Sequence, residues 1–208
     1  MSGETGFLQN AYKVEDTEQT RDFYQDWAAT YDREIAENGY ATPRRCAEAL
    51  AQFQDDKSAR ILDIGCGTGL SGVALAEAGF ANVDGSDLSA KMLKAAKARE
   101  GLYQNLWEAD LNDPFPFEPG TYQSMSAMGV LATSHAPAGT IDQILAALDV
   151  GGLFVFSLND HTLLDPDYEA RIFENVDTGM ARLLFREYGD HLPGINMKSN
   201  VYVLEKAR

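Results

Sequence analysis

A short apolar run that leads into a glycine-rich loop constrains this chain more than any other feature. Residues 60–62 read Arg-Ile-Leu, residues 63–69 read Asp-Ile-Gly-Cys-Gly-Thr-Gly, and the mostly apolar residues 70–76 follow. This order predicts a buried strand, a tight loop and then a helix. Glycines at alternate positions let the backbone turn sharply and approach a ligand closely, because no Cβ stands in the way. The N–H groups at the start of the helix would face that ligand with the positive end of the helix dipole.

Acidic residues end or follow three of the predicted strands. Asp63 ends the first strand, Asp87 ends a second strand over residues 81–87, and Asp110 follows a third strand over residues 103–109. An acid at the end of the second strand of a βαβ unit can accept two hydrogen bonds from the hydroxyls of a ribose. Together with the loop, these acids indicate a small ligand that carries both an amine and a carboxylate.

The glycine loop also fits a rival pattern. Residues 67–72 match the dinucleotide-binding spacing G-x-G-x-x-G. In that pattern the first glycine directly follows the strand, whereas Gly65 and Cys66 intervene here, and Asp63 would bring a carboxylate towards a pyrophosphate. A nicotinamide site therefore stays a weaker alternative, as does a loop with only a turn-forming role. Neither alternative explains why Asp87 and Asp110 both occur.

Several further motifs occur in a recognisable order with this loop. They are residues 62–69, 87–89, 92–93, 109–111 and 150–154. In this order and spacing the chain resembles the class I S-adenosylmethionine-dependent methyltransferases, in the small-molecule branch of type 11 and type 12 sequences. The resemblance extends from about residue 58 to residue 160, and residues 27–50 are similar to the Williams–Beuren-region methyltransferase-like group.

The resemblance implies a role for each matching residue. Asp63, Gly65 and Gly67, with Cys66 between them, would contact the amino-acid half of S-adenosylmethionine. Asp87 would bind the ribose hydroxyls, and Leu88 would pack on the adenine face. Asp110 would accept a hydrogen bond from the adenine amine, with Leu111 beside it. Tyr31 would lie near the cofactor carboxylate. Residues 129–131, at the end of the fourth strand, would lie near the sulfonium.

Alternating strand and helix patterns predict an α/β fold with helices on both faces of a mostly parallel sheet. The resemblance adds a Rossmann-like sheet of seven strands with the last strand antiparallel. Residues 1–56 are expected to form a helical cap or mobile lid, and residues 57–208 the cofactor-binding domain. Within the cap, one helix is predicted over residues 17–37 and a second over residues 42–53, with Thr42 as its N-cap.

The remaining elements are predicted from local signals. They are strands at 60–64, 121–129 and 153–158, helices at 139–149 and from Asp165 to Val176, a helix capped by Ser89, and a terminal strand pair at 180–188 and 200–205.

The three histidines are the candidates for acid–base chemistry. His135, His161 and His191 each follow a predicted strand end or lie in the last hairpin, on the ligand-binding edge. His135 is the tentative catalytic base, because the methyl acceptor would approach just past the fourth strand; an ordinary loop position is the alternative for all three. Aromatic candidates in the cap are Tyr24, Trp27, Tyr31 and Tyr40.

Charge and cysteine content narrow the function further. The formal net charge is -15, and nucleic-acid binders usually carry a basic patch, so a nucleic-acid substrate is not expected. The apolar runs are too short to cross a bilayer. Cys46 and Cys66 lack metal-ligand spacing, so we expect no metal and a reducing, cytoplasmic compartment.

The sequence thus predicts methyl transfer from S-adenosylmethionine to a small molecule. A non-catalytic or regulatory S-adenosylmethionine-binding protein is the main alternative, and a nicotinamide-dependent oxidoreductase is a weaker one. The oligomeric state and the methyl acceptor are left open.

Overall fold

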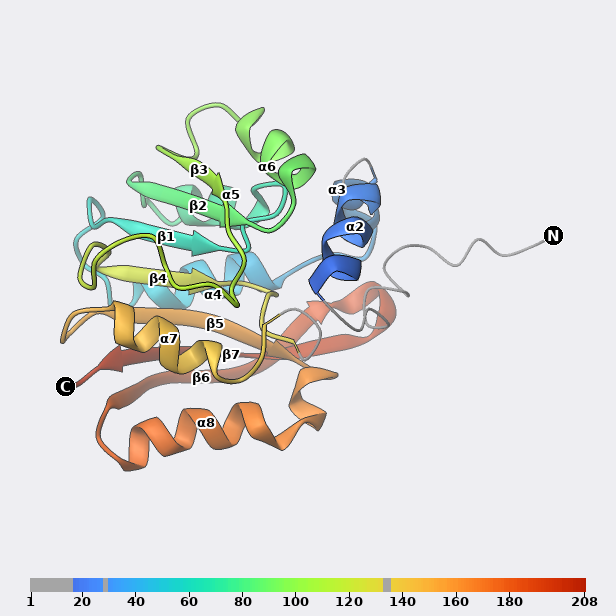
Figure 1. Ribbon diagram of the computed structural model, residues 1–208. Helices are drawn as coiled ribbons and strands as arrows, with labels where there is room; N and C mark the ends of the chain where they lie inside the picture. Colours follow the sequence, from blue (N-terminus) through green and yellow to red (C-terminus); the bar gives the residue numbers. More distant parts are fainter. Residues whose placement is uncertain (1–16, 28–29, 133–135) are drawn as a thin grey trace.

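The computed structural model describes residues 17–27, 30–132 and 136–208. A seven-stranded sheet in the order β3-β2-β1-β4-β5-β7-β6 forms its centre (Figure 1). The strands are β1 (Ile61–Ile64), β2 (Val83–Asp87), β3 (Leu106–Glu108), β4 (Ser124–Ala127), β5 (Leu153–Asn159), β6 (Ala181–Leu192) and β7 (Met197–Lys206). Strands β1 to β5 pair in parallel, and β7 runs antiparallel to both β5 and β6. The predicted Rossmann-like sheet with an antiparallel last strand is therefore confirmed.

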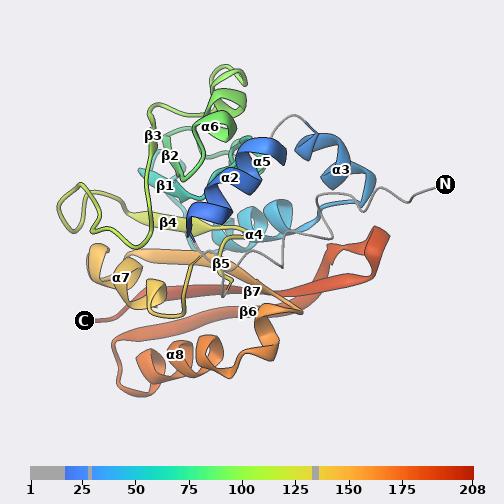
Figure 2. The ribbon, with the colours of Figure 1, turned by 45° about the vertical axis from the view of Figure 1, so that its right-hand side comes forward.

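Helices cover both faces of the sheet and the carboxyl ends of its parallel strands (Figures 1 and 2). They are α2 (Thr17–Trp27), α3 (Tyr31–Glu37), α4 (Thr42–Ala51), α5 (Leu70–Glu77), α6 (Ala90–Lys97), α7 (Thr140–Ala147) and α8 (Pro166–Asp177), with the short 3₁₀ helices η2 (Thr162–Leu164) and η3 (Pro193–Ile195). One core lies between α4, α5 and the sheet, and a second lies between α7, α8 and the opposite face. Strand β5 is buried on both sides along residues 153–158, and its sequence accordingly begins with the apolar run Leu-Phe-Val-Phe.

The predicted single cap helix over residues 17–37 is wrong, because the structure divides it at Thr30. The N–H of Thr30 donates to the carbonyl of Trp27, 2.9 Å away, and ends α2. The carbonyl of Thr30 then accepts from the N–H of Glu34 at 3.0 Å, and its hydroxyl donates to the Glu34 carboxylate at 2.6 Å. These local bonds start a new helix at Tyr31.

The start of α4 also differs from its prediction. Ala41 occupies the N-cap position, and Thr42 is already the first helical residue with no capping bond from its side chain. The Thr42 hydroxyl instead lies 2.7 Å from Nδ1 of His191. A partner that is distant in the sequence therefore takes the hydroxyl that local propensity assigns to the cap.

The cap helices lie across the carboxyl ends of the parallel strands. Figures 1 and 2 show α2 and α3 at the edge towards which β1, β2 and β4 point. The connection from α3 to α4 is joined to the tip of the β6–β7 hairpin. The N–H of Ala41 donates to the carbonyl of His191 at 2.9 Å, and the N–H of Gly194 donates to the carbonyl of Asn38 at 3.0 Å.

Helix α4 falls within the predicted cap but packs on α5, β5 and β7. The domain boundary at residue 56 stays a prediction. Among the helices of the described ranges, none combines the length and the apolar character that crossing a bilayer requires.

Candidate functional site

A cavity opens at the carboxyl ends of the parallel strands, where ligands bind in sheets of this kind. We call it the edge cavity. Its described wall comes from the ends of β1 to β4 and from the cap: Ile64, Gly65, Gly67, Ser86, Asp87, Leu88, Met92, Ala109, Leu111, Met128, Gly129, Val130, Thr20, Tyr24 and Tyr31. Five of the predicted cofactor-binding residues between Gly65 and Leu111, together with Tyr31, thus meet around one hollow.

Two glycines of the loop have different structural roles. Gly65 and Gly67 both have left-handed φ angles, of 64° and 55°. A Cβ on Gly65 would lie 2.4 Å from Cγ2 of Val130, so this glycine is needed for packing. A Cβ on Gly67 would meet no atom within 4 Å, because this residue faces the open side of the loop. Gly67 therefore leaves an open cradle in the loop, with room for a ligand to approach the backbone closely.

Asp87 connects this cradle with the second strand. Its Oδ2 accepts a hydrogen bond from the N–H of Gly67 at 2.8 Å, and its Oδ1 accepts from the N–H of Ser89 at 2.9 Å. Burial raises the pKa of the Asp87 carboxyl to about 6, although both of these hydrogen bonds act to lower it. The side chain lines the edge cavity, where further hydrogen-bond donors can reach it. A pair of ribose hydroxyls fits this position.

Ser89 caps α6 as predicted. Its hydroxyl accepts from the N–H of Met92 at 3.3 Å, so Asp87 sits at a fixed turn between β2 and α6.

Asp63 is held differently from Asp87. Its side chain is fully buried, and its two oxygens accept from the hydroxyls of Ser71 at 2.5 Å, Tyr103 at 2.8 Å and Ser126 at 2.8 Å. Burial raises its pKa, and the three hydroxyls oppose that rise. The carboxylate thus ties together α5, β4 and the segment before β3 beneath the glycine loop. Direct contact of Asp63 with a cofactor stays a prediction.

The side chain of Cys66, in the glycine loop, is also buried. Its N–H donates to the carbonyl of Ser86 at 2.9 Å, which joins the loop to β2. Burial raises the pKa of its thiol well above the ordinary value, so it is held as the thiol.

The end of β3 contributes one wall residue and one turn. Leu111 lines the edge cavity, whereas Oδ1 of Asp110 accepts from the backbone and side-chain N–H groups of Asn112 at 2.9 and 2.8 Å. This turn fixes the path of the chain beside Leu111. The predicted contact between Asp110 and an adenine amine stays a prediction.

The cap closes the cavity with aromatic side chains. Tyr24 and Tyr31 line the cavity, while Trp27 is buried between them, with its ring centre 4.7 Å from that of Tyr31. The hydroxyl of Tyr40 donates to the carbonyl of Met128 at 3.4 Å, at the end of β4. Thr20, which the sequence analysis did not single out, also lines the cavity. Its position four residues before Tyr24 places both on one helix face, and that spacing is the signal that could have identified it.

The predicted convergence of three histidines at the site can be followed for two of them. His135 lies outside the described residues. His161 lies on an exposed turn at the start of η2, and His191 is buried near the end of β6. Burial lowers the pKa of His191 to about 4, so this imidazole is neutral at physiological pH.

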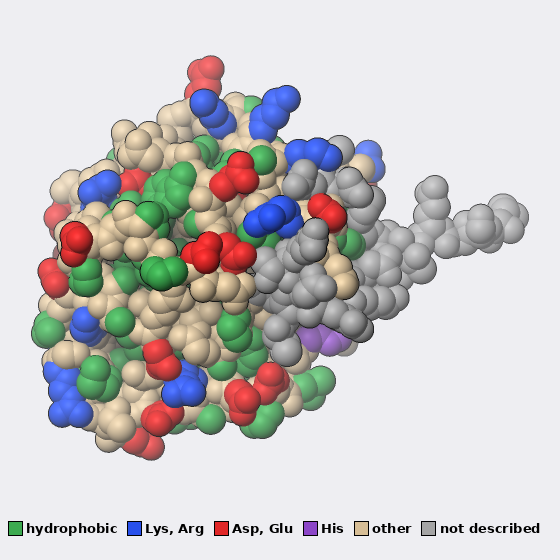
Figure 3. Space-filling model, viewed as in Figure 1, with side chains coloured by type: hydrophobic (Ala, Val, Ile, Leu, Met, Phe, Trp, Pro, Cys, Tyr) green, Lys and Arg blue, Asp and Glu red, His purple; other side chains and the backbone are tan. Residues whose placement is uncertain are grey.

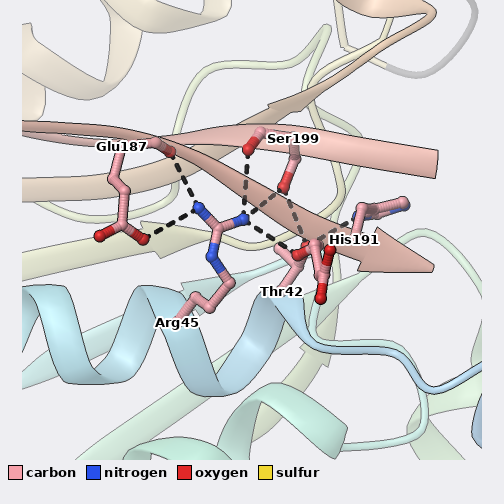
Figure 4. A network of polar contacts seen from close by, with 6 residues as sticks. Thr42, Arg45, Glu187, His191 and Ser199 are labelled. Carbon is pink, nitrogen blue, oxygen red and sulfur yellow. Dashed lines mark hydrogen bonds and ion pairs between the residues drawn. The ribbon is translucent and has the colours of Figure 1, made fainter. Parts of the chain in front are cut away.

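His191 belongs to a network that joins α4 to the β6–β7 hairpin (Figure 4). The Thr42 hydroxyl lies between Nδ1 of His191 and the hydroxyl of Ser199, at 2.7 and 3.2 Å. Arg45 donates to the carbonyls of Glu187, Asp190 and Ser199 at 2.9 to 3.2 Å, and to the Ser199 hydroxyl at 3.1 Å. The network therefore positions α4 and its preceding loop against the hairpin.

Comparison with known proteins places this geometry in a family. Methyltransferase-like protein 27 of Homo sapiens is 36% identical over 137 residues, which cover 64% of this chain and 56% of that protein. Among the other curated relatives, the chain spans between 29% and 64% of the protein's length.

Two solved structures share the fold. Magnesium protoporphyrin IX methyltransferase of Synechocystis PCC 6803 with bound S-adenosylmethionine superposes with a TM-score of 0.67 at 18% identity, covering 93% of this chain and 98% of that chain. A TehB-like S-adenosylmethionine-dependent methyltransferase of Corynebacterium glutamicum gives 0.63 at 20% identity, covering 89% and 98%.

The family model described as a methyltransferase domain matches residues 36–196, from the end of α3 to the tip of the last hairpin. That range includes the glycine loop, Asp87 and every strand end around the edge cavity. The chain belongs to the methyltransferase-domain family, among the class I S-adenosylmethionine-dependent methyltransferases.

Proposed function

We propose that this protein transfers the methyl group of S-adenosylmethionine to a small-molecule acceptor. The observation that carries the proposal is the pairing of Asp87 with the open cradle at Gly67 in one cavity. Asp87 suits the ribose of a nucleoside, and the cradle at Gly67 suits an amino-acid tail that lies close to the backbone. S-adenosylmethionine supplies a methyl group that is already activated, so the protein needs mainly to align the acceptor and exclude water.

The cavity wall supports a role for each half of the cofactor. Leu88, Met92 and Leu111 would form the apolar surface for the adenine, with Asp110 near its amine. Tyr31 would face the carboxylate of the amino-acid half. Fixed contacts of this kind set the position of the sulfonium relative to the end of β4.

The cap side chains at the cavity favour a small acceptor. Thr20, Tyr24 and Tyr31 of the cap line the cavity together with the strand ends, so they would limit the space beside the cofactor. The net charge of -15 opposes an extended nucleic-acid substrate, and on the face seen in Figure 3 the Lys and Arg side chains are interspersed with Asp and Glu.

The relatives' own activities differ, and so the acceptor must be tested. One is a ubiquinone biosynthesis O-methyltransferase of Xylella fastidiosa, 32% identical over 105 residues. Another is an 18S rRNA (guanine-N(7))-methyltransferase of Bos taurus, 43% identical over 84 residues. His135 is retained as the proposed base for an acceptor that must lose a proton. We also propose a cytoplasmic location, which suits the two free, buried cysteines, Cys46 and Cys66.

The test follows the methyl group. S-adenosylmethionine with a tritiated methyl group is incubated with the protein and with separated small-molecule, RNA and protein fractions of a cell extract. We expect the label to appear in a small-molecule product that separates from unreacted S-adenosylmethionine, in an amount equal to the S-adenosylhomocysteine formed. With Asp87→Ala we expect no labelled product above background. Label in RNA or protein alone would overturn the small-molecule acceptor. Tight binding of S-adenosylmethionine without turnover in any fraction would favour the non-catalytic alternative.

A further inference from the structure

A cluster of three side chains joins the cap to the glycine loop outside the edge cavity. Oδ1 of Asp32, in α3, accepts from the hydroxyl of Thr68 at 2.5 Å, and Oδ2 accepts from the guanidinium of Arg99. Nε of Arg99 in turn donates to the carbonyl of Thr68 at 2.8 Å. We call Asp32, Thr68 and Arg99 the clasp. None of the three is among the described residues that line the edge cavity.

The clasp acts on the part of the loop that the cofactor would meet. Thr68 directly follows Gly67, whose N–H donates to Asp87. Two neighbouring loop residues are thus held by carboxylates from different elements, one from β2 and one from the cap. Thr68 is only 2% exposed, so its hydroxyl has little access to water in place of Asp32.

The geometry of α3 links the clasp to the cavity. Tyr31 and Asp32 are consecutive residues, and consecutive side chains of an α-helix point about 100° apart. Asp32 therefore contacts the loop while Tyr31 lines the same edge cavity as Gly65 and Gly67. The ion pair between Asp32 and Arg99 is partly exposed, at 46% and 32%, so the bond to the buried Thr68 hydroxyl is the contact with the larger expected effect.

We propose that the clasp is a positioning device for the amino-acid half of the cofactor, an inference that rests on the proposed function. By fixing α3 against Thr68, it holds Tyr31 at the distance from the glycine cradle that this half requires. The adenosine half meets Asp87, Leu88 and Leu111, none of which contacts Asp32 or Arg99 in the interactions described above. Loss of the clasp should therefore weaken one half of the site selectively.

A pair of ligands distinguishes this role from a merely structural one. S-adenosylhomocysteine contains both halves, whereas 5′-methylthioadenosine lacks the amino-acid half. For Thr68→Val we expect S-adenosylhomocysteine to bind about tenfold more weakly, as for the loss of one charge-assisted hydrogen bond, and 5′-methylthioadenosine to bind nearly as in the wild type. Thr68→Ser keeps the hydroxyl and should restore the affinity.

Calorimetry on the full chain measures the affinity of each variant for the two ligands, and a thermal melt shows that each variant is folded. Asp32→Ala, which removes both acceptor oxygens at a partly exposed position, provides a second variant in case Thr68→Val does not fold. Glu48→Gln is the matched control, because it breaks the exposed Arg44–Glu48 pair on α4, away from the loop. Equal weakening of both ligands, or wild-type affinity in Asp32→Ala and Thr68→Val, would overturn the inference. If the wild type binds neither ligand, the proposed function itself fails.

Discussion

Asp87 is the residue at which protonation and ligand binding are most directly coupled. Burial raises its pKa to about 6, and ribose hydroxyls donate only to oxygens that have lone pairs free to accept. Ligand binding should therefore favour the ionised form. A fall in pH through about 6 protonates the free protein and opposes binding, by up to about tenfold for each pH unit below the pKa.

We predict that the affinity for S-adenosylhomocysteine is constant above pH 7 and falls between pH 6 and pH 5. Above pH 7, Asp87→Asn should bind more weakly than the wild type by roughly thirty- to a thousandfold, as for the loss of two charge-assisted hydrogen bonds. Its affinity should also be independent of pH over this range. Calorimetry from pH 5 to pH 8 measures both profiles. A wild-type profile as flat as that of the variant would contradict the assignment of Asp87 to the ribose.

Gly65 and Gly67 should respond differently to the same substitution. A methyl group on Gly65 would collide with Val130, whereas one on Gly67 would extend into open space, and both positions carry the strain of a left-handed φ. We predict that Gly67→Ala folds with a loss of about 1–2 kcal/mol but binds S-adenosylhomocysteine poorly. Gly65→Ala should lose considerably more stability. Urea unfolding and calorimetry on both variants provide the comparison; normal ligand affinity in a folded Gly67→Ala would show that the cradle does not hold the cofactor.

At the scale of elements, α4 depends on the Arg45 network for its attachment to the last hairpin. The guanidinium donates to three carbonyls and a hydroxyl, and its side chain is only 10% exposed. Arg45→Met would leave those acceptors without their donor, at a cost of about 2–3 kcal/mol. We predict a melting temperature lower by about 4–12 °C. Arg44→Met, at an exposed neighbouring position, is the control and should shift the melt little. Equal melts for the two variants would contradict the prediction.

Elements whose signals are local were predicted correctly. The glycine loop, the Ser89 cap and the strand that ends at Asp87 follow from residues adjacent in the sequence, because backbone freedom and capping act over a few positions. The break at Thr30 was missed, since the four-residue apolar spacing from Phe23 to Ile35 continues through it.

Features built from distant partners could not be predicted in this way. The Thr42 hydroxyl leaves its expected capping role for His191, which is 149 positions away, and Asp32 meets Arg99, which is 67 positions away. Only the folded sheet brings such pairs together. The carboxylate of Asp63 was placed correctly at the end of its strand, but its three hydroxyl partners come from three other segments of the chain.

For the whole molecule, stability against pH combines two ionisable groups, the buried His191 and the half-buried Asp87, with opposite effects. His191 has a folded-state pKa of about 4, below its ordinary value of 6.5, so the unfolded chain binds the proton first and stability is lost as pH falls from 6.5 to 4. Asp87 has a folded-state pKa of about 6, above 3.8, so the folded chain binds the proton first and stability is gained as pH falls from 6 to 3.8. Each shift corresponds to at most about 3 kcal/mol.

Between pH 6 and pH 4 these two contributions nearly cancel, so removing either group should reveal the other. We predict that Asp87→Asn loses stability steeply on acidification through this range, because the effect of His191 is then unopposed. His191→Gln should instead gain stability over the same range. Asp63, whose own pKa is raised and whose charge also raises the pKa of Asp87, adds a gain on acidification in both variants, so the test is the difference between the two slopes. Urea unfolding of the two variants at intervals from pH 7 to pH 4 measures that difference. Parallel curves would contradict both assignments, because the opposing slopes require that folding lowers the pKa of His191 and raises that of Asp87.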